Sequence, residues 1–148
     1  MTRNTDPDDM WWDAWRGIVF TSARVLRTVS RDLEAGQGIS ITFLDVLGRL
    51  NDEPGHKLRM QELQERLLFT YSGLTRLIDR IEQAGLVRRA PVPNDRRGVF
   101  VVLTDVGAET YGRGIAQHRA DVERVFAGRL SPEQHQAVAD ALRSAWEG

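Results

Sequence analysis

Residues 60–103 constrain the fold more than any other part of the chain. They contain two short helical patterns, 60–67 and 71–84, separated by three residues. In the second pattern, apolar side chains recur at the i, i+3, i+4, i+7 spacing of one buried helix face, at Leu74, Leu77, Ile78 and Ile81. Thr70 is a suitable N-cap, and Gly85 stands where a left-handed C-cap residue is needed. The pattern predicts two helices joined by a tight turn.

Two β-type runs, 86–90 and 99–103, follow directly and enclose a polar tip over 91–98. The two prolines of the tip are expected to keep the first arm from pairing along its whole length, because proline lacks the N–H that a ladder needs. Its Asn-Asp pair and glycine supply turn chemistry, which leaves Arg96 and Arg97 exposed. A hairpin placed directly after the second helix of a helix-turn-helix is a wing.

The rest of the chain is predicted to be helical apart from one short extended piece. The expected elements are a long amphipathic helix over 9–34, a helix over 40–50 capped by Ser40, an extended piece over 57–59, a helix capped by Thr104 and reaching about 128, and a last helix opened by a capping box of Ser131 and Gln134. The buried side of the last helix is expected to consist of Val138, Ala141, Leu142, Ala145 and Trp146. The fold class is therefore mainly α with a small β-hairpin wing.

The overall charge hides a local basic stretch. The 148 residues carry a formal net charge of -1, yet residues 66–97 hold seven arginines against three acidic residues. A basic stretch inside a near-neutral protein is the footprint expected of a surface that meets phosphates.

Composition excludes several other classes of protein. The chain has no cysteine, and its three histidines form no pair with ligand spacing, so neither a metal nor a cofactor is expected. No nucleophile elbow, phosphate loop or metal motif is present, so no catalytic residues are predicted. The acidic N-terminus and short apolar runs predict no secretion signal and no membrane span, which makes a cytoplasmic location the expectation.

The order of elements and several short motifs resemble the MarR-type winged-helix transcription regulators. The carrying segments are Gly38-Ile-Ser-x-x-Phe43 with Val46-Leu47, Ser72-Gly-Leu-Thr-Arg-Leu-Ile-Asp-Arg-Ile-Glu82, Gly85-Leu-Val-Arg-Arg89, Asp95-Arg-Arg97 and Leu103-Thr-x-x-Gly107. The resemblance covers residue 11 to the C-terminus, and the joint spacing of these segments is more specific than any one of them.

The resemblance implies a single domain over 1–148, in which helices over 1–36 and 105–148 join two copies and residues 40–104 form the winged helix-turn-helix. It implies a homodimer on a pseudo-palindromic operator of double-stranded DNA, released by a small ligand that is often aromatic or anionic. It also implies that Arg96 or Arg97 enters the minor groove.

Three groups of site residues follow. Base readout in the major groove is expected from Tyr71, Ser72, Thr75, Arg76 and Arg80, with Asp79 orienting Arg76 or Arg80. The wing group is Asp95, Arg96 and Arg97, in which Asp95 either braces an arginine or is a plain turn residue. An effector pocket is expected to draw on Trp12, Trp15, Phe43, Asp45 and Tyr111.

The effector group has alternative interpretations. For Trp11, Trp12 and Trp15, a role in a core or a dimer seam is favoured over a pocket, because large aromatic side chains at helical spacing usually mark packing. Asp45 is either a buried carboxylate that holds a ligand or an arginine of the other subunit, or an ordinary exposed residue.

The hypothesis is a ligand-responsive dimeric repressor. One alternative is a winged-helix protein-interaction module without specific DNA binding, and another is a small enzyme that uses paired acids such as Asp45 and Asp105.

Overall fold

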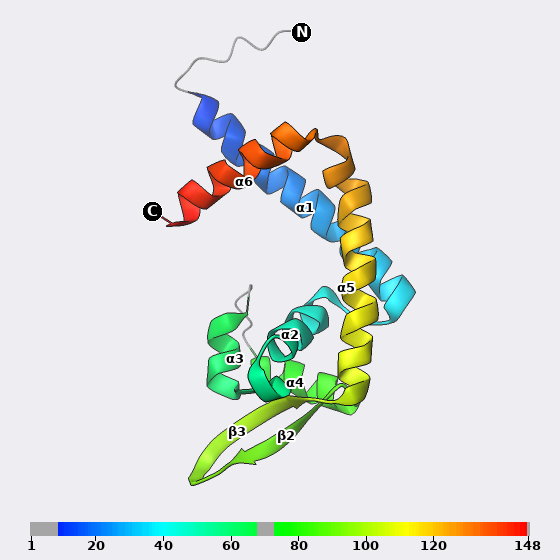
Figure 1. The fold of residues 1–148 in the computed structure, drawn as a ribbon, viewed down its shortest axis with the longest axis vertical. Helices are drawn as coiled ribbons and strands as arrows, with labels where there is room; N and C mark the ends of the chain where they lie inside the picture. The colour runs from blue at the N-terminus through cyan, green and yellow to red at the C-terminus, as the bar shows by residue number, and fades with distance from the viewer. Residues whose placement is uncertain (1–8, 68–72, 148) are drawn as a thin grey trace. The chain divides into compact units, whose positions relative to one another are not determined.

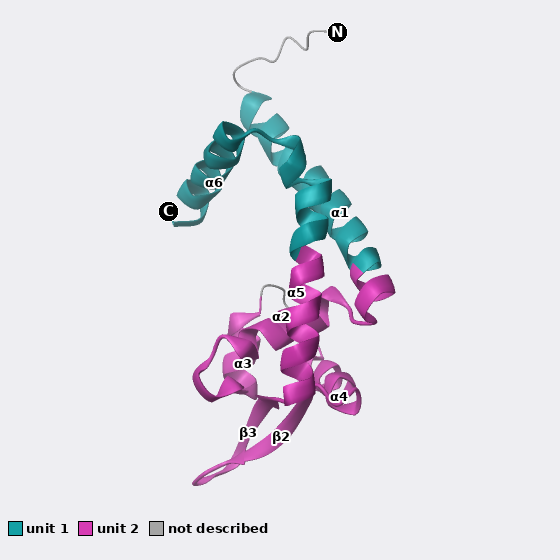
Figure 2. Ribbon diagram, turned by 45° about the vertical axis from the view of Figure 1, so that its right-hand side comes forward, with its two compact units in different colours: residues 1–32, 119–148 teal, residues 33–118 magenta. Residues whose placement is uncertain are grey.

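The computed structural model describes residues 9–67 and 73–147, which form two compact units. Residues 33–118 form the winged-helix unit, and the described parts of 1–32 and 119–148 form the helical unit (Figure 2). Helix α5, Asp105–Val125, contributes residues to both units.

The winged-helix unit combines short helices with a three-stranded antiparallel sheet (Figure 1). The strands are ordered β1-β3-β2, so the long β3 lies in the centre and β2 at an edge. The elements are α2 (Ile41–Asn51), a 3-10 turn (Pro54–His56), β1 (Lys57–Arg59), α3 (Met60–Arg66), α4 (Leu74–Gln83), β2 (Val87–Val92), β3 (Asp95–Leu103) and the first part of α5.

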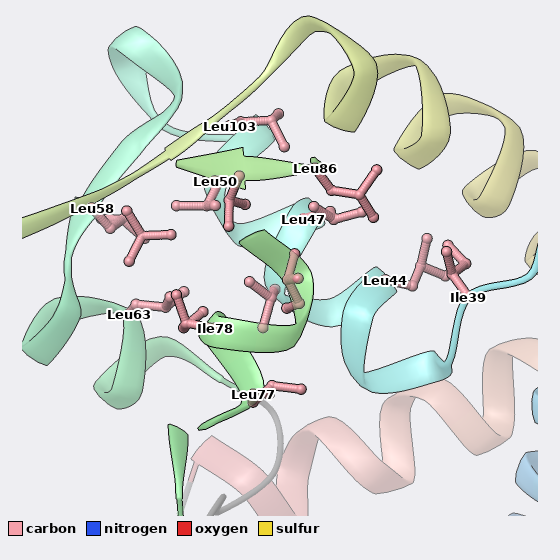
Figure 3. Packing of buried hydrophobic residues seen from close by; sticks show 14 of the residues in the cluster. Ile39, Leu44, Leu47, Leu50, Leu58, Leu63, Leu77, Ile78, Leu86 and Leu103 are labelled. Carbon is pink, nitrogen blue, oxygen red and sulfur yellow. The ribbon is translucent and has the colours of Figure 1, made fainter. Parts of the chain in front are cut away.

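One hydrophobic core holds this unit together (Figure 3). The apolar stripe predicted for the second helix of the motif is confirmed, since all four of its members on α4 are buried. They pack with residues from α2, α3 and all three strands, including Leu44, Leu47, Leu50, Leu58, Leu63, Val87, Val101 and Leu103. Burial of this stripe leaves the opposite side of α4 in solvent.

Two predicted helix caps of the winged-helix unit are confirmed, and a third cap was missed. The Ser40 hydroxyl accepts from the Phe43 N–H, and the Thr104 hydroxyl accepts from the Gly107 N–H. Helix α3 has no serine or threonine cap, but the carboxylate of Glu62 accepts from the Arg59 N–H at 2.9 Å. That bond satisfies one backbone donor at the start of the helix.

The start of α4 differs from the prediction. The helix begins at Leu74 and not at residue 71, because Gly73 has a φ of +93° and cannot belong to a right-handed helix. The expected N-cap, Thr70, lies outside the described residues. At the other end, Gly85 has the predicted left-handed conformation, and the N–H groups of Gly85 and Leu86 donate to the carbonyls of Glu82 and Ile81.

The wing pairs further than the two prolines suggested. Strand β2 continues to Val92, with Pro91 opposite Val99 and Val92 opposite Asp95, so the turn itself is only Pro93-Asn94. An edge strand tolerates proline because half of its N–H groups face away from the sheet. The register shifts between Pro91 and Val92, so the residues after Asp95 on β3 form an irregular stretch.

The helical unit contains α1 (Met10–Gln37) up to residue 32, the end of α5, a 3-10 turn (Ala127–Arg129) and α6 (Pro132–Glu147). Helix α5 ends at Val125, slightly earlier than the predicted 128. Arg124 of α5 bonds Asp32 of α1 at 2.8 Å. The Ser131–Gln134 capping box is confirmed by both of its hydrogen bonds.

The face of α6 that was expected to be buried is exposed within the chain. Val138, Leu142 and Trp146 are 39%, 45% and 87% exposed. No residue of α6 is buried, so the rest of the helical unit, as far as the structure describes it, does not cover this side of the helix. Among the described residues, no helix combines the length and apolar character that crossing a bilayer requires.

Replacing Gly85 with alanine is expected to lower the free energy of unfolding by about 1 kcal/mol, because a Cβ is disfavoured at a positive φ. Gly112 is the matched control: it lies inside α5, and a Cβ there would meet nothing within 4 Å. Alanine at 112 is expected to raise the same free energy by about 0.5 kcal/mol. Urea unfolding measures both, and effects of equal sign would contradict this account.

Candidate nucleic-acid interface

The solvent-facing side of α4 carries several polar side chains of the predicted site. Thr75, Arg76 and Arg80 are exposed, while Asp79 is half-buried. Tyr71 and Ser72 lie outside the described residues. Helix α4 therefore presents a hydroxyl and two guanidinium groups on the side opposite its buried stripe.

Arg80 is partly engaged by the protein itself. Its guanidinium carbon lies 5.5 Å from the ring centroid of Phe43 on α2, a cation–π distance. Phe43 packs against the hydrophobic core. Its contacts are therefore with the core and with Arg80, and they do not place it in an effector pocket.

Arg89 of β2 fastens the wing to α4, and sequence reasoning missed this role. Its guanidinium bonds Asp79 at 2.7 Å and also the carboxylate of Glu82, and the second carboxylate oxygen of Glu82 accepts from the Arg89 N–H at 2.9 Å. Asp79 and Glu82 stand three residues apart on one helix face, a spacing that suits the planar fork of arginine. The prediction that Asp79 orients Arg76 or Arg80 is therefore wrong.

The surroundings of Arg89 keep it charged. Desolvation by burial lowers its pKa, but the hydrogen bonds and charges of Asp79 and Glu82 outweigh that effect and raise the pKa above its ordinary value. The guanidinium has both carboxylates as partners and acts as a connector between α4 and β2.

Asp95 organises the backbone at the tip of the wing. One carboxylate oxygen accepts from the N–H groups of Arg97 at 3.1 Å and Gly98 at 3.0 Å, and the other bonds the Arg59 guanidinium at 2.8 Å. The predicted role of Asp95 as a turn residue is confirmed by these backbone bonds. Asp95 also pairs with an arginine, but that arginine is Arg59 of β1 and not Arg96 or Arg97. The backbone bond from Arg97 and the side-chain bond from Arg59 lower the pKa of Asp95.

This lowered pKa gives the wing tip a defined pH dependence. A carboxylate whose pKa is lower in the folded state stabilises that state above its unfolded pKa. The contribution is lost as the pH falls through the lower folded-state value, so the tip is held throughout the neutral range.

The ion pairs separate the seven arginines of the basic stretch into two classes. Arg66 pairs with Glu53, and Arg89 pairs with Asp79 and Glu82. The other five form no ion pair within the described part of the chain: Arg76, Arg80, Arg88, Arg96 and Arg97. These five lie on α4 and the wing and are exposed. Within residues 66–97, the uncompensated positive charge therefore lies on the two elements of a winged helix that face nucleic acid.

Thr104 joins the same two elements to α5. Its hydroxyl donates to the Gly85 carbonyl at 2.7 Å and accepts from the Gly107 N–H, and its own N–H donates to the Leu86 carbonyl. One residue thus connects the end of α4, the end of the wing and the start of α5.

The predicted effector residues are only partly brought together. Asp45 and Tyr111 line one cavity of about 250 Å³ between α2 and α5, the α2–α5 cavity, together with Ile41, Leu44, Gly48, Arg49, Asp52, Ile115 and His118. Trp12 and Trp15 lie on α1 of the helical unit, where they are 46% and 53% exposed. Arg49 was missed, although its position four residues after Asp45 on a helix is a readable signal.

The helical unit contains a larger apolar groove of about 460 Å³. Residues of α1, of α6 and of the segment between α5 and α6 line it, among them Ile18, Val25, Phe126, Val138 and Leu142. Within the described residues, no group of three or more histidines and acidic residues is placed to bind a metal.

Two short helices followed by a hairpin, with exposed arginines on the second helix and on the hairpin, have the architecture of winged helix-turn-helix DNA-binding proteins. The MarR family model matches residues 37–98. AbsC, a MarR family transcriptional regulator from Streptomyces coelicolor, is 32% identical, with coverage of 99% of this chain and 97% of that one and a TM-score of 0.83. The chain belongs to the MarR family of transcription regulators.

Two further relatives support this assignment. A second MarR family regulator from Streptomyces coelicolor, solved in complex with DNA, is 32% identical, with coverage of 91% of this chain and 88% of that chain and a TM-score of 0.81. The HTH-type transcriptional regulator YkoM of Bacillus subtilis is 32% identical over 83% of this chain and 80% of its own length. The family consists of transcription regulators and not of enzymes.

Replacing Arg89 with methionine is expected to lower the free energy of unfolding by about 1–2 kcal/mol, because Asp79 and Glu82 lose the guanidinium that bonds both. Arg88 is the matched control, since it is the neighbouring exposed arginine and has no ion pair in the described structure. Methionine at 88 is expected to change the free energy by less than about 0.5 kcal/mol. Equal effects in urea unfolding would show that Arg89 does not connect α4 to the wing.

Proposed function

We propose that this MarR family protein is a homodimeric repressor that binds a pseudo-palindromic operator and is released by a small-molecule effector. The observation that carries the DNA-binding part is the separation of the arginines. Of the seven arginines within residues 66–97, the five that lack a carboxylate partner lie on α4 and the wing, and Arg89, between them, is neutralised by Asp79 and Glu82.

In this proposal α4 reads the major groove. Thr75 and Arg76 are exposed on its outer side, and Tyr71 and Ser72 are proposed to join them. Arg80 stacks on Phe43 and is proposed to contact the DNA from that position. Arg96 and Arg97 are proposed to reach the minor groove, on a stretch of backbone that Asp95 holds.

The dimer part rests on apolar side chains that a single chain leaves in solvent. On α1, Trp11, Trp15 and Phe20 are 68%, 53% and 66% exposed, and α6 adds Leu142 and others. Exposed apolar surface of this extent marks an interface. A two-fold dimer presents two copies of α4 and therefore matches an operator with two-fold symmetry.

The effector part rests on the α2–α5 cavity. A ligand regulates only if it binds one state of the dimer more tightly than the other. Helix α5 contributes residues both to the cavity and to the helical unit, so a ligand against its middle turns contacts an element that continues into the proposed dimer. The protein is proposed to act in the cytoplasm, where the chromosome is accessible.

Fluorescence anisotropy on duplexes from the DNA beside the gene and on scrambled duplexes tests the DNA-binding part. Arg76→Ala is expected to cost about 1–3 kcal/mol on the specific duplex and to relax the preference between duplexes. Arg96→Ala and Arg97→Ala are expected to weaken binding to both, with a shallower salt dependence.

The control for these variants is Arg143→Ala on α6, which removes the same charge outside the winged-helix unit. It is expected to leave affinity nearly unchanged. Unchanged affinity in both wing variants would contradict the wing assignment. Equal, salt-sensitive binding to both duplexes by the wild type would favour the protein-interaction module.

Sedimentation velocity tests the dimer. Leu142→Glu places a charge on the exposed apolar side of α6 and is expected to shift the protein from dimer to monomer, because an unpaired carboxylate is costly in an apolar interface. Ser144→Glu adds the same charge to an exposed polar position of α6 and is expected to leave the dimer intact. A monomeric wild type at micromolar concentration would contradict the proposal.

A further inference from the structure

The α2–α5 cavity has apolar walls and a polar end. Ile41, Leu44 and Ile115 supply the walls. Gly48 keeps the cavity open on the α2 side, because a Cβ at that position would lie only 3.1 Å from the Tyr111 ring. An apolar cavity with a few convergent polar groups is the usual form of a small-molecule site, and the volume of about 250 Å³ suits a small ligand.

The charges at the polar end are unusual for a site that would bind an anion. Asp45 has a side chain only 6% exposed and pairs with Arg49 at 3.5 Å, so the guanidinium is already engaged by a carboxylate. Asp52 adds a second carboxylate to the lining. Beside His118, the lining carries two carboxylates and one guanidinium, and these three groups together repel an entering anion.

Tyr111 offers groups that suit a cation. Burial, with the negative charge of Asp52 as a further cause, raises the pKa of its phenol, so the hydroxyl remains neutral at physiological pH. Its half-buried ring borders the cavity, and an aromatic face attracts an ammonium group.

We propose that the α2–α5 cavity binds a small organic cation, an apolar or aromatic body with a protonated amine, and not the anionic ligand that the family resemblance implies. The ammonium group lies toward Asp45, Asp52 and the Tyr111 ring, and the apolar body lies against Ile41, Leu44 and Ile115. That this ligand acts as the effector rests on the proposed function, whereas the preference for a cation does not.

Isothermal titration of the full-length protein with two probes of similar size tests the preference. The probes are 2-phenylethylamine, a cation at neutral pH, and 3-phenylpropionate, an anion. The cation is expected to bind about tenfold more tightly. Tighter binding of the anion, equal binding, or no binding of either probe at millimolar concentration would overturn the proposal.

Three variants separate charge from shape. Asp52→Asn is expected to reduce the preference for the cation severalfold, and Arg49→Gln is expected to increase it. Gly48→Ala narrows the cavity beside Tyr111 and is expected to lower the affinity for both probes equally, so that the ratio of the two affinities is unchanged. Unchanged ratios in both charge variants would show that the probes bind elsewhere.

The anisotropy assay separates failure of this inference from failure of the proposed function. If the ligand-free protein showed no preference for the operator, the proposed regulator mechanism would be contradicted. The measured ratio of affinities for the two probes would still test the cation preference separately. Normal operator binding that responds to the anion and not to the cation would overturn the ligand class alone.

Discussion

Burial of one face of α4 determines what the winged-helix unit presents to solvent. Leu74, Leu77, Ile78 and Ile81 enter the core with residues of α2, α3 and the sheet. Because a helix has 3.6 residues per turn, burying that stripe places Thr75 and Arg76 outward. The side chains proposed to read DNA are therefore oriented by hydrophobic packing on the opposite side of the same helix.

Charge pairing then separates structural cations from cations available to a ligand. Arg89 is satisfied by Asp79 and Glu82, and Arg59 is satisfied by Asp95. These pairs hold the wing to α4 and shape the wing tip, while Arg76, Arg96 and Arg97 keep their charge uncompensated. A chain with a net charge of -1 can in this way carry a concentrated basic surface.

Regulation requires that the two units be linked. Helix α5 runs through both, and Thr104 connects its start to the end of α4 and the end of the wing. The α2–α5 cavity lies against the same helix. The proposed effector, the proposed dimer and the proposed DNA-reading elements thus share one continuous element, which is a physical basis for coupling between them.

Local signals in the sequence were enough to determine the helices, most of their caps, the wing and the family. The apolar period of α4, the Ser40, Thr104 and Ser131 caps and the left-handed Gly85 depend on residues close together in the chain, and all were predictable. Pairing across the chain was not, because Asp79 has arginines next to it in sequence yet bonds Arg89, which β2 brings alongside α4. The lining of the α2–α5 cavity could be predicted only in part for the same reason: the packing of α2 on α5 decides that Asp45 and Tyr111 share a cavity with Arg49 and Asp52.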